Sequence, residues 1–147
     1  MPQNVSPPTA LRMKKKTMQQ SLNARFAFSY RKTGDRLDAG AIITIFPKLS
    51  EVLLIEGENN YSKVFLAPQF ADSHALRQGQ IRIAKNIGYF AARLPAHFFF
   101  RASKNALVNL LRAIRLENGT IYLDMLQKPV FISPHQIKKF KERMIAL

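Results

Sequence analysis

Three short segments of this chain concentrate side chains that can read nucleic acid, namely those of Asn, Gln, Ser, Lys and Arg. They are Glu58–Lys63 (ENNYSK), Arg101–Asn105 (RASKN) and Ser133–Lys139 (SPHQIKK), and each adjoins a short apolar run. Amide, hydroxyl and guanidinium groups hydrogen-bond to base edges, while lysine and arginine neutralise phosphates. Two of the segments also have a simpler structural interpretation, because Asn59-Asn60 suits a turn and Ser133-Pro134 suits the start of a helix. Taken together, the three favour DNA as the ligand.

The net charge of the chain agrees with a polyanionic partner. Lys and Arg number 23 against 9 Asp and Glu, which gives a net charge of +14. A charge of this size attracts polyanions and raises their association rate. Residues 1–38 hold eight basic and two acidic residues, a net charge of +6, so the remaining residues carry +8. Ribosomal or other RNA, an anionic membrane surface and solubility alone remain alternatives to DNA.

The sequence shows no constellation for catalysis or metal binding. The three histidines are too dispersed for paired metal ligands, and the absence of cysteine excludes disulfides, thiolate nucleophiles and Cys-ligated zinc. Glu56 and Glu58 would share one face of a strand, but in so basic a chain we expect them to pair with a nearby Lys or Arg. No P-loop, GxGxxG or GxSxG motif occurs. We therefore expect no enzyme activity, no metal and no cofactor.

The chain lacks the apolar segments that direct proteins to membranes. No run of about 18 apolar residues occurs, and the first residues, MPQNVSPPTALRMKKK, lack the apolar segment of a signal peptide. The absence of cysteine fits a reducing compartment. We expect no membrane segment and a cytoplasmic, nucleoid-associated protein.

Two regions differ in composition. Residues 1–38 combine prolines, basic residues and scattered apolar residues, which predicts a flexible basic tail with a short helix around Ala10–Leu22. Residues 39–147 predict a single domain that is mostly β-sheet with short α-helices. Expected strands cover Ala41–Phe46, Val52–Ile55, Tyr61–Leu66, Gln80–Ala84, Phe98–Phe100, Leu110–Glu117, Thr120–Leu126 and Pro129–Ser133.

The connections between these strands give further expectations. Asn118-Gly119 predicts a tight hairpin, because both residues accept a positive φ. Asn86 predicts the cap of a helix over Ile87–Leu94, and an amphipathic helix closes the chain. Residues 68–79 predict a long polar connection.

In their order and spacing, these motifs resemble the LytTR DNA-binding domain of bacterial transcription regulators. The matching segments lie within residues 40–146 and read LLIEGENNYSKVFL, ARLPAHFFFRASKNALVNL, AIRLENGTIYLDM and FISPHQIKKFKERM. The resemblance implies an elongated, mostly antiparallel β fold whose loops enter successive major grooves of DNA. It also implies a stand-alone member of the family without a receiver domain.

The resemblance assigns DNA contacts to three loops, at residues 60–63, 101–105 and 133–136. It places the main contacts at Ser62, Lys104 and His135, makes Arg101 a phosphate contact or loop organiser, and gives Asn109 the task of holding the loop. Pro134 stands where the family commonly has arginine, so the base preference is not carried over. The full set of expected contact residues is Asn60, Tyr61, Ser62, Lys63, Arg101, Ser103, Lys104, Asn105, Ser133, His135, Gln136 and Lys138.

Our hypothesis is a transcription regulator that binds duplex DNA, as two copies on direct repeats and as a homodimer on that DNA. One alternative is a general RNA-binding or ribosome-associated protein, for which exposed Tyr61 and Tyr122 would stack on single-stranded bases. Another is an interaction module whose charged tail binds an acidic protein.

Overall fold

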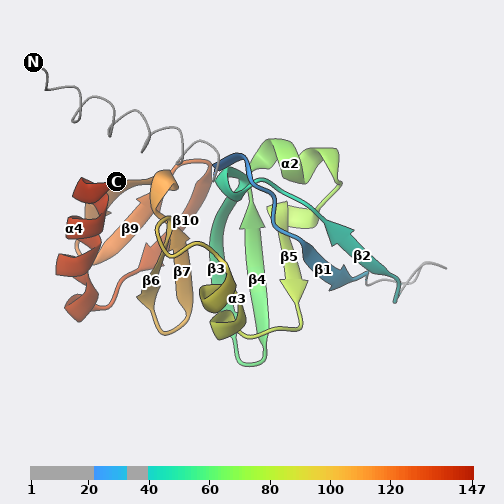
Figure 1. Ribbon diagram of the computed structural model, residues 1–147, viewed down its shortest axis with the longest axis horizontal. Helices are drawn as coiled ribbons and strands as arrows, with labels where there is room; N and C mark the ends of the chain where they lie inside the picture. The colour runs from blue at the N-terminus through green and yellow to red at the C-terminus, as the bar shows by residue number, and fades with distance from the viewer. Residues whose placement is uncertain (1–21, 33–39) are drawn as a thin grey trace, which may run out of the picture.

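The computed structural model describes residues 22–32 and 40–147, which form three antiparallel sheets with short helices at their margins (Figure 1). The central sheet has five strands in the order β5-β4-β3-β7-β6. A three-stranded sheet has the order β10-β9-β8, and a two-stranded sheet pairs β1 with β2. The expected class, mostly β with short α-helices, is confirmed.

The strands are short and follow the β-branched and apolar runs of the sequence. Their bounds are β1 Phe28–Arg31, β2 Ile42–Ile45, β3 Val52–Glu58, β4 Tyr61–Leu66, β5 Gln80–Ile83, β6 Phe99–Ser103, β7 Ala106–Asn109, β8 Ala113–Glu117, β9 Thr120–Leu123 and β10 Leu126–Phe131. The α-helices are α2 Pro68–Ser73, α3 Ile87–Arg93 and α4 Ile137–Ala146. Single 3-10 turns occur at Leu49–Glu51, Arg77–Gly79, Leu110–Arg112 and Pro134–Gln136.

The central sheet separates two hydrophobic cores. On one side, Ile55 and Val64 pack with Phe90 of α3 and with Phe28 of β1. On the other side, side chains of the central sheet pack with those of β9, β10 and α4. All four residues of the run Val52–Ile55 are fully buried, so β3 is covered on both faces, as its unbroken apolar sequence predicts.

Part of the expected basic tail belongs to the fold. Residues 28–31 form β1 and pair with β2, and Phe28 is only 1% exposed. Its ring lies 4.8 Å from that of Phe26 and 5.6 Å from that of Phe90. The expectation of a flexible tail is therefore corrected for β1, because burial of one aromatic ring outweighs the basic composition around it. Most of the expected Ala10–Leu22 helix lies outside the described residues.

The connection over residues 68–79 is also more ordered than its polar composition predicts. Pro68 occupies the first turn of α2, where its missing N–H has no cost, and Phe70 and Ala71 are buried.

The hairpin at Asn118-Gly119 is confirmed, with φ of +50° and +72°. Asn86 caps α3 as expected, since its Oδ1 accepts a hydrogen bond from the Tyr89 N–H at 3.0 Å. No helix of the described residues is long and apolar enough to cross a membrane.

Candidate nucleic-acid interface

The three polar segments lie along one edge of the molecule. Two of them include the β3–β4 and β6–β7 turns, which are seen at the bottom of Figure 1. The antiparallel pairing of Glu56 with Ala106 places the β3–β4 turn beside the β6–β7 turn. The Gly57 N–H donates to the Asn105 carbonyl at 2.9 Å, and the Ser133 N–H donates to the Ala102 carbonyl, also at 2.9 Å. We call this edge, formed by residues 59–60, 104–105 and 133–136, the turn edge.

The β3–β4 turn exposes Asn59 and Asn60 to solvent. Asn59 has a φ of +57°, a left-handed conformation that asparagine tolerates well. Tyr61 is 42% exposed, and the Arg82 guanidinium lies 4.3 Å from the centre of its ring. Lys63 forms an ion pair with Glu58 at 2.7 Å, so its charge is already partly neutralised.

The Ser62 side chain is buried in the fold and not exposed to solvent, contrary to the predicted DNA contact. It is 0% exposed, and its hydroxyl donates to the Lys85 carbonyl at 2.7 Å. The reason is the alternation of side chains along β4, which sends Ser62 to the face opposite Tyr61 and Lys63. The prediction of a direct contact at Ser62 is therefore corrected.

The second segment is a strand end and a tight turn rather than a five-residue loop. Strand β6 runs through Ser103, and only Lys104 and Asn105 form the exposed turn. The half-buried Arg101 donates from Nε to the Ser103 carbonyl at 3.2 Å and from Nη2 to the Lys104 carbonyl at 2.7 Å. The Ser103 hydroxyl accepts from the Asn105 N–H at 3.3 Å. Arg101 thus fixes the backbone that carries Lys104, as expected of a loop organiser.

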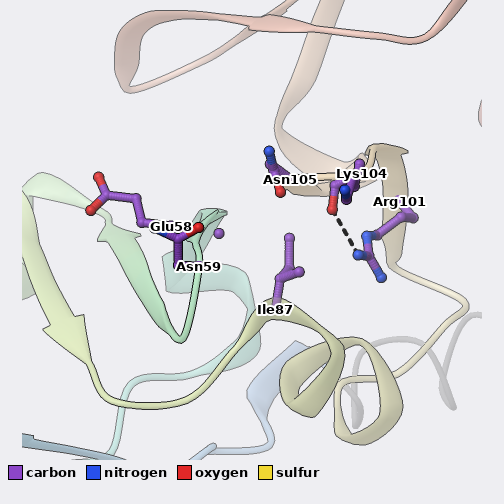
Figure 2. Close-up of a pocket in the computed structure, with 7 residues that line it drawn as sticks. Glu58, Asn59, Ile87, Arg101, Lys104 and Asn105 are labelled. Atoms are coloured by element: carbon purple, nitrogen blue, oxygen red, sulfur yellow. Dashed lines mark hydrogen bonds between the residues drawn. The ribbon is translucent and has the colours of Figure 1, made fainter.

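A shallow hollow of about 540 Å³ separates the two turns (Figure 2). In Figure 2 the Glu58 carboxylate points away from Arg101 and Lys104, toward the other side of the β3–β4 turn. The start of α3 also contributes, through Ile87, a residue that the sequence motifs do not mark. The lining residues are Gly57, Glu58, Asn59, Ile87, Arg101, Lys104 and Asn105.

The third segment leads from β10 into the last helix. Ser133 is half-buried, and the 3-10 turn Pro134–Gln136 follows, with His135 exposed and Gln136 half-buried. The Ser133 side chain makes no capping hydrogen bond, so helix capping does not explain its presence. Lys138 is exposed on the first turn of α4.

Comparison with known proteins identifies this arrangement. The model of the LytTr DNA-binding domain family matches residues 43–145. The chain belongs to the LytTR family. Among solved structures, it is similar to a LytTr DNA-binding domain from Bacillus cereus, with a TM-score of 0.55 and 15% sequence identity. That match covers 82% of this chain and 96% of the other, and it supports the shared fold. No curated protein matches the chain.

Charge on the turn edge of this LytTR domain is distributed unevenly. Among the ion pairs of residues 22–32 and 40–147, those beside the turn edge join Lys63 and Arg82 to Glu58, and Lys128 to Glu56 at 3.0 Å. Pairing of both glutamates with cations is as expected. A hydrogen bond from Lys63 lowers the pKa of Glu58, aided by the positive charges around it. In the same ranges no carboxylate pairs with Lys104 or Lys138, which leaves both ammonium groups available for phosphate.

Asn109 of the LytTR motif has a different task from the one expected. It is 0% exposed, and its side chain bonds to the Leu49 and Val52 carbonyls and to the Leu111 N–H. These groups lie at the opposite end of β7 from the Lys104-Asn105 turn. Asn109 therefore joins the connections flanking β3 and β7, and Arg101 is the residue that holds the turn.

Proposed function

We propose that this LytTR domain is a sequence-specific regulator of transcription that reads the major groove of duplex DNA through its turn edge. The observation that carries the proposal is the exposed, carboxylate-free Lys104, held by Arg101 between two other polar segments on the same edge. Membership of the family supports DNA as the partner. The turn edge would supply side chains that bind phosphates and side chains that form hydrogen bonds to base edges. We also propose that two copies of the domain bind direct repeats and form a homodimer on the DNA.

The side chains of the turn edge and of the adjoining Lys138 divide into two kinds of contact. Lys104 and Lys138 neutralise phosphates and release counterions, which makes affinity depend on salt. Exposed amide and imidazole groups at Asn60, Asn105 and His135 form hydrogen bonds to base edges, each good bidentate pair discriminating by about 1–3 kcal/mol. Phosphate contacts fix the position of the protein, and base contacts then select the sequence.

Selection of preferred sites from random duplex DNA, followed by two substitutions, tests this assignment. Lys104→Gln should weaken binding to every sequence by about fivefold to tenfold at 0.15 M salt, and should reduce the slope of log K against log salt by roughly 0.9. His135→Ala should instead change the preferred base at particular positions. Arg77→Gln, which removes an exposed charge beyond the other end of β5, is the control. If Lys104→Gln and Arg77→Gln bind alike, the turn edge is not the interface.

The RNA-binding alternative finds less support in the aromatic side chains. The Arg82 guanidinium covers the Tyr61 ring, and the Arg115 guanidinium lies 4.2 Å from the centre of the Tyr122 ring. Unstacked bases need open aromatic faces, and here a cation already occupies one face of each ring. Competition of single-stranded RNA against the selected duplex decides between the two ligands, since equal affinity would favour RNA.

Glu58→Gln is expected to strengthen DNA binding about threefold to tenfold, because the change removes a negative charge near the phosphates and releases Lys63. The pKa of Glu58 is lowered, so its stabilising ion pair is complete above the ordinary pKa and is lost only as pH falls through the lowered value. At pH 7 the wild-type carboxylate is therefore charged. Titration with a non-specific duplex checks the effect, with Glu117→Gln on β8 as the control. Weaker binding by Glu58→Gln would contradict it.

A further inference from the structure

The junction between β5 and α3 brings a residue outside the three motif segments to the turn edge. Strand β5 pairs with β4 through Ile83 and Ser62, so β5 ends at the same edge as the β3–β4 turn. Lys85 is the second residue after this strand and is exposed. In Figure 1 the start of α3 lies beside the β3–β4 turn.

Two side-chain hydrogen bonds fix the backbone around Lys85. The buried Ser62 hydroxyl donates to the Lys85 carbonyl at 2.7 Å, and Asn86 caps the helix that follows. Gly57, which pairs with Ser62, lets α3 approach closely, since a Cβ at this position would lie 3.2 Å from the Ile87 Cβ. The position of the Lys85 backbone relative to the β3–β4 turn is therefore fixed in the protein without DNA.

The Lys85 ammonium remains available to an anion. Within the described ranges, 22–32 and 40–147, no carboxylate forms an ion pair with it. Its one contact of note is with the Tyr89 ring, whose centre lies 5.1 Å from Nζ. A cation–π contact leaves the positive charge in place, unlike the carboxylate beside Lys63. Like Lys104 and unlike Lys63, Lys85 therefore has a positive charge that no carboxylate of the described residues neutralises.

We propose that Lys85 is a further phosphate-binding residue of the DNA interface and that Ser62 is a positioning residue that acts through it. This inference rests on the proposed function. It gives Ser62, whose side chain cannot reach DNA, a physical role: its hydroxyl holds the carbonyl of the lysine that does reach it. The phosphate that Lys85 contacts lies on the α3 side of the β3–β4 turn.

Lys85→Gln tests the proposal by the salt dependence of binding to the selected duplex. We expect affinity to fall about fivefold to tenfold at 0.15 M salt and the slope of log K against log salt to decrease by roughly 0.9. Arg77→Gln removes the same charge away from the turn edge and should leave both quantities nearly unchanged. If Lys85→Gln matches Arg77→Gln while Lys104→Gln weakens binding, the inference fails and the proposed function stands. If Lys104→Gln has no effect either, both fail.

A double-mutant cycle tests the positioning role of Ser62. Ser62→Ala should weaken DNA binding in the wild-type background but not in the Lys85→Gln background, because its effect passes through Lys85. Urea denaturation of each variant confirms that the domain is folded under the binding conditions. If the two losses multiply in the double variant, Ser62 acts independently of Lys85 and the positioning role is overturned.

Discussion

Arg101→Ala is expected to weaken binding to the preferred duplex by about 100-fold, or roughly 2.7 kcal/mol. Two losses combine in this variant. The turn that carries Lys104 and Asn105 loses the guanidinium that holds the Ser103 and Lys104 carbonyls, and the interface loses a positive charge. Fluorescence anisotropy with the selected duplex and with an unrelated duplex measures the effect on both kinds of binding.

Arg101→Lys separates the charge from the geometry. Lysine keeps the charge but cannot bond to two carbonyls with the planar, forked geometry of a guanidinium. We therefore expect about a tenfold loss of specific binding with an unchanged salt slope, consistent with a conserved charge. Full recovery by lysine would show that Arg101 acts through charge alone and that the organisation of the turn does not matter.

Asn109→Ala is expected to lower the free energy of unfolding by about 3–5 kcal/mol, which is a large share of the stability of a small domain. The amide donates to the Leu49 carbonyl at 3.2 Å and to the Val52 carbonyl at 2.8 Å, and accepts from the Leu111 N–H at 3.0 Å. Alanine removes the amide from all three backbone groups, two of them in the buried interior, although the Leu49 carbonyl keeps its bond from the Val52 N–H. Urea denaturation monitored by circular dichroism measures the change.

Asn105→Ala is the matched control for this prediction. Asn105 is exposed on the turn edge, and we expect its replacement to change stability by less than about 0.5 kcal/mol. In DNA binding we expect the reverse order, so that Asn105→Ala lowers the affinity more than Asn109→Ala does. An Asn109→Ala domain as stable as Asn105→Ala would contradict the structural role of the buried amide.

Features with a local signal were predictable from the sequence. The run Val52–Ile55 is apolar without interruption, and it forms the strand buried on both faces. Asn118-Gly119 accepts positive φ at both positions and forms the hairpin, while Asn86 precedes an apolar stripe and caps α3. In each case neighbouring residues alone decide the conformation, so tertiary structure need not be known.

Features that depend on distant neighbours were not predictable in the same way. Ser62 lies in a polar segment, and only the pairing of β4 with β5 brings its hydroxyl to the Lys85 carbonyl. Phe28 follows a basic segment, and its burial depends on the partner Phe90, some 60 residues away in the sequence. Lys85 belongs to no motif, and the register of β5 with β4 is what brings it to the turn edge. Composition and the spacing of motifs do not predict contacts between residues that are far apart in the sequence.

Backbone hydrogen bonds join the three polar segments and limit how far the protein can adapt when it binds DNA. Gly57 is tied to Asn105, and Ser133 is tied to Ala102, so the distances between the segments are fixed by the central sheet. A duplex with one base pair more or less between its contacted positions cannot be accommodated by stretching the protein. If the proposed interface is used, we expect the DNA to bend or twist instead, which would make flexible steps such as TA and CA/TG favourable at positions that no side chain touches. Operators for this domain would then share a spacing and a deformability as well as a set of contacted bases.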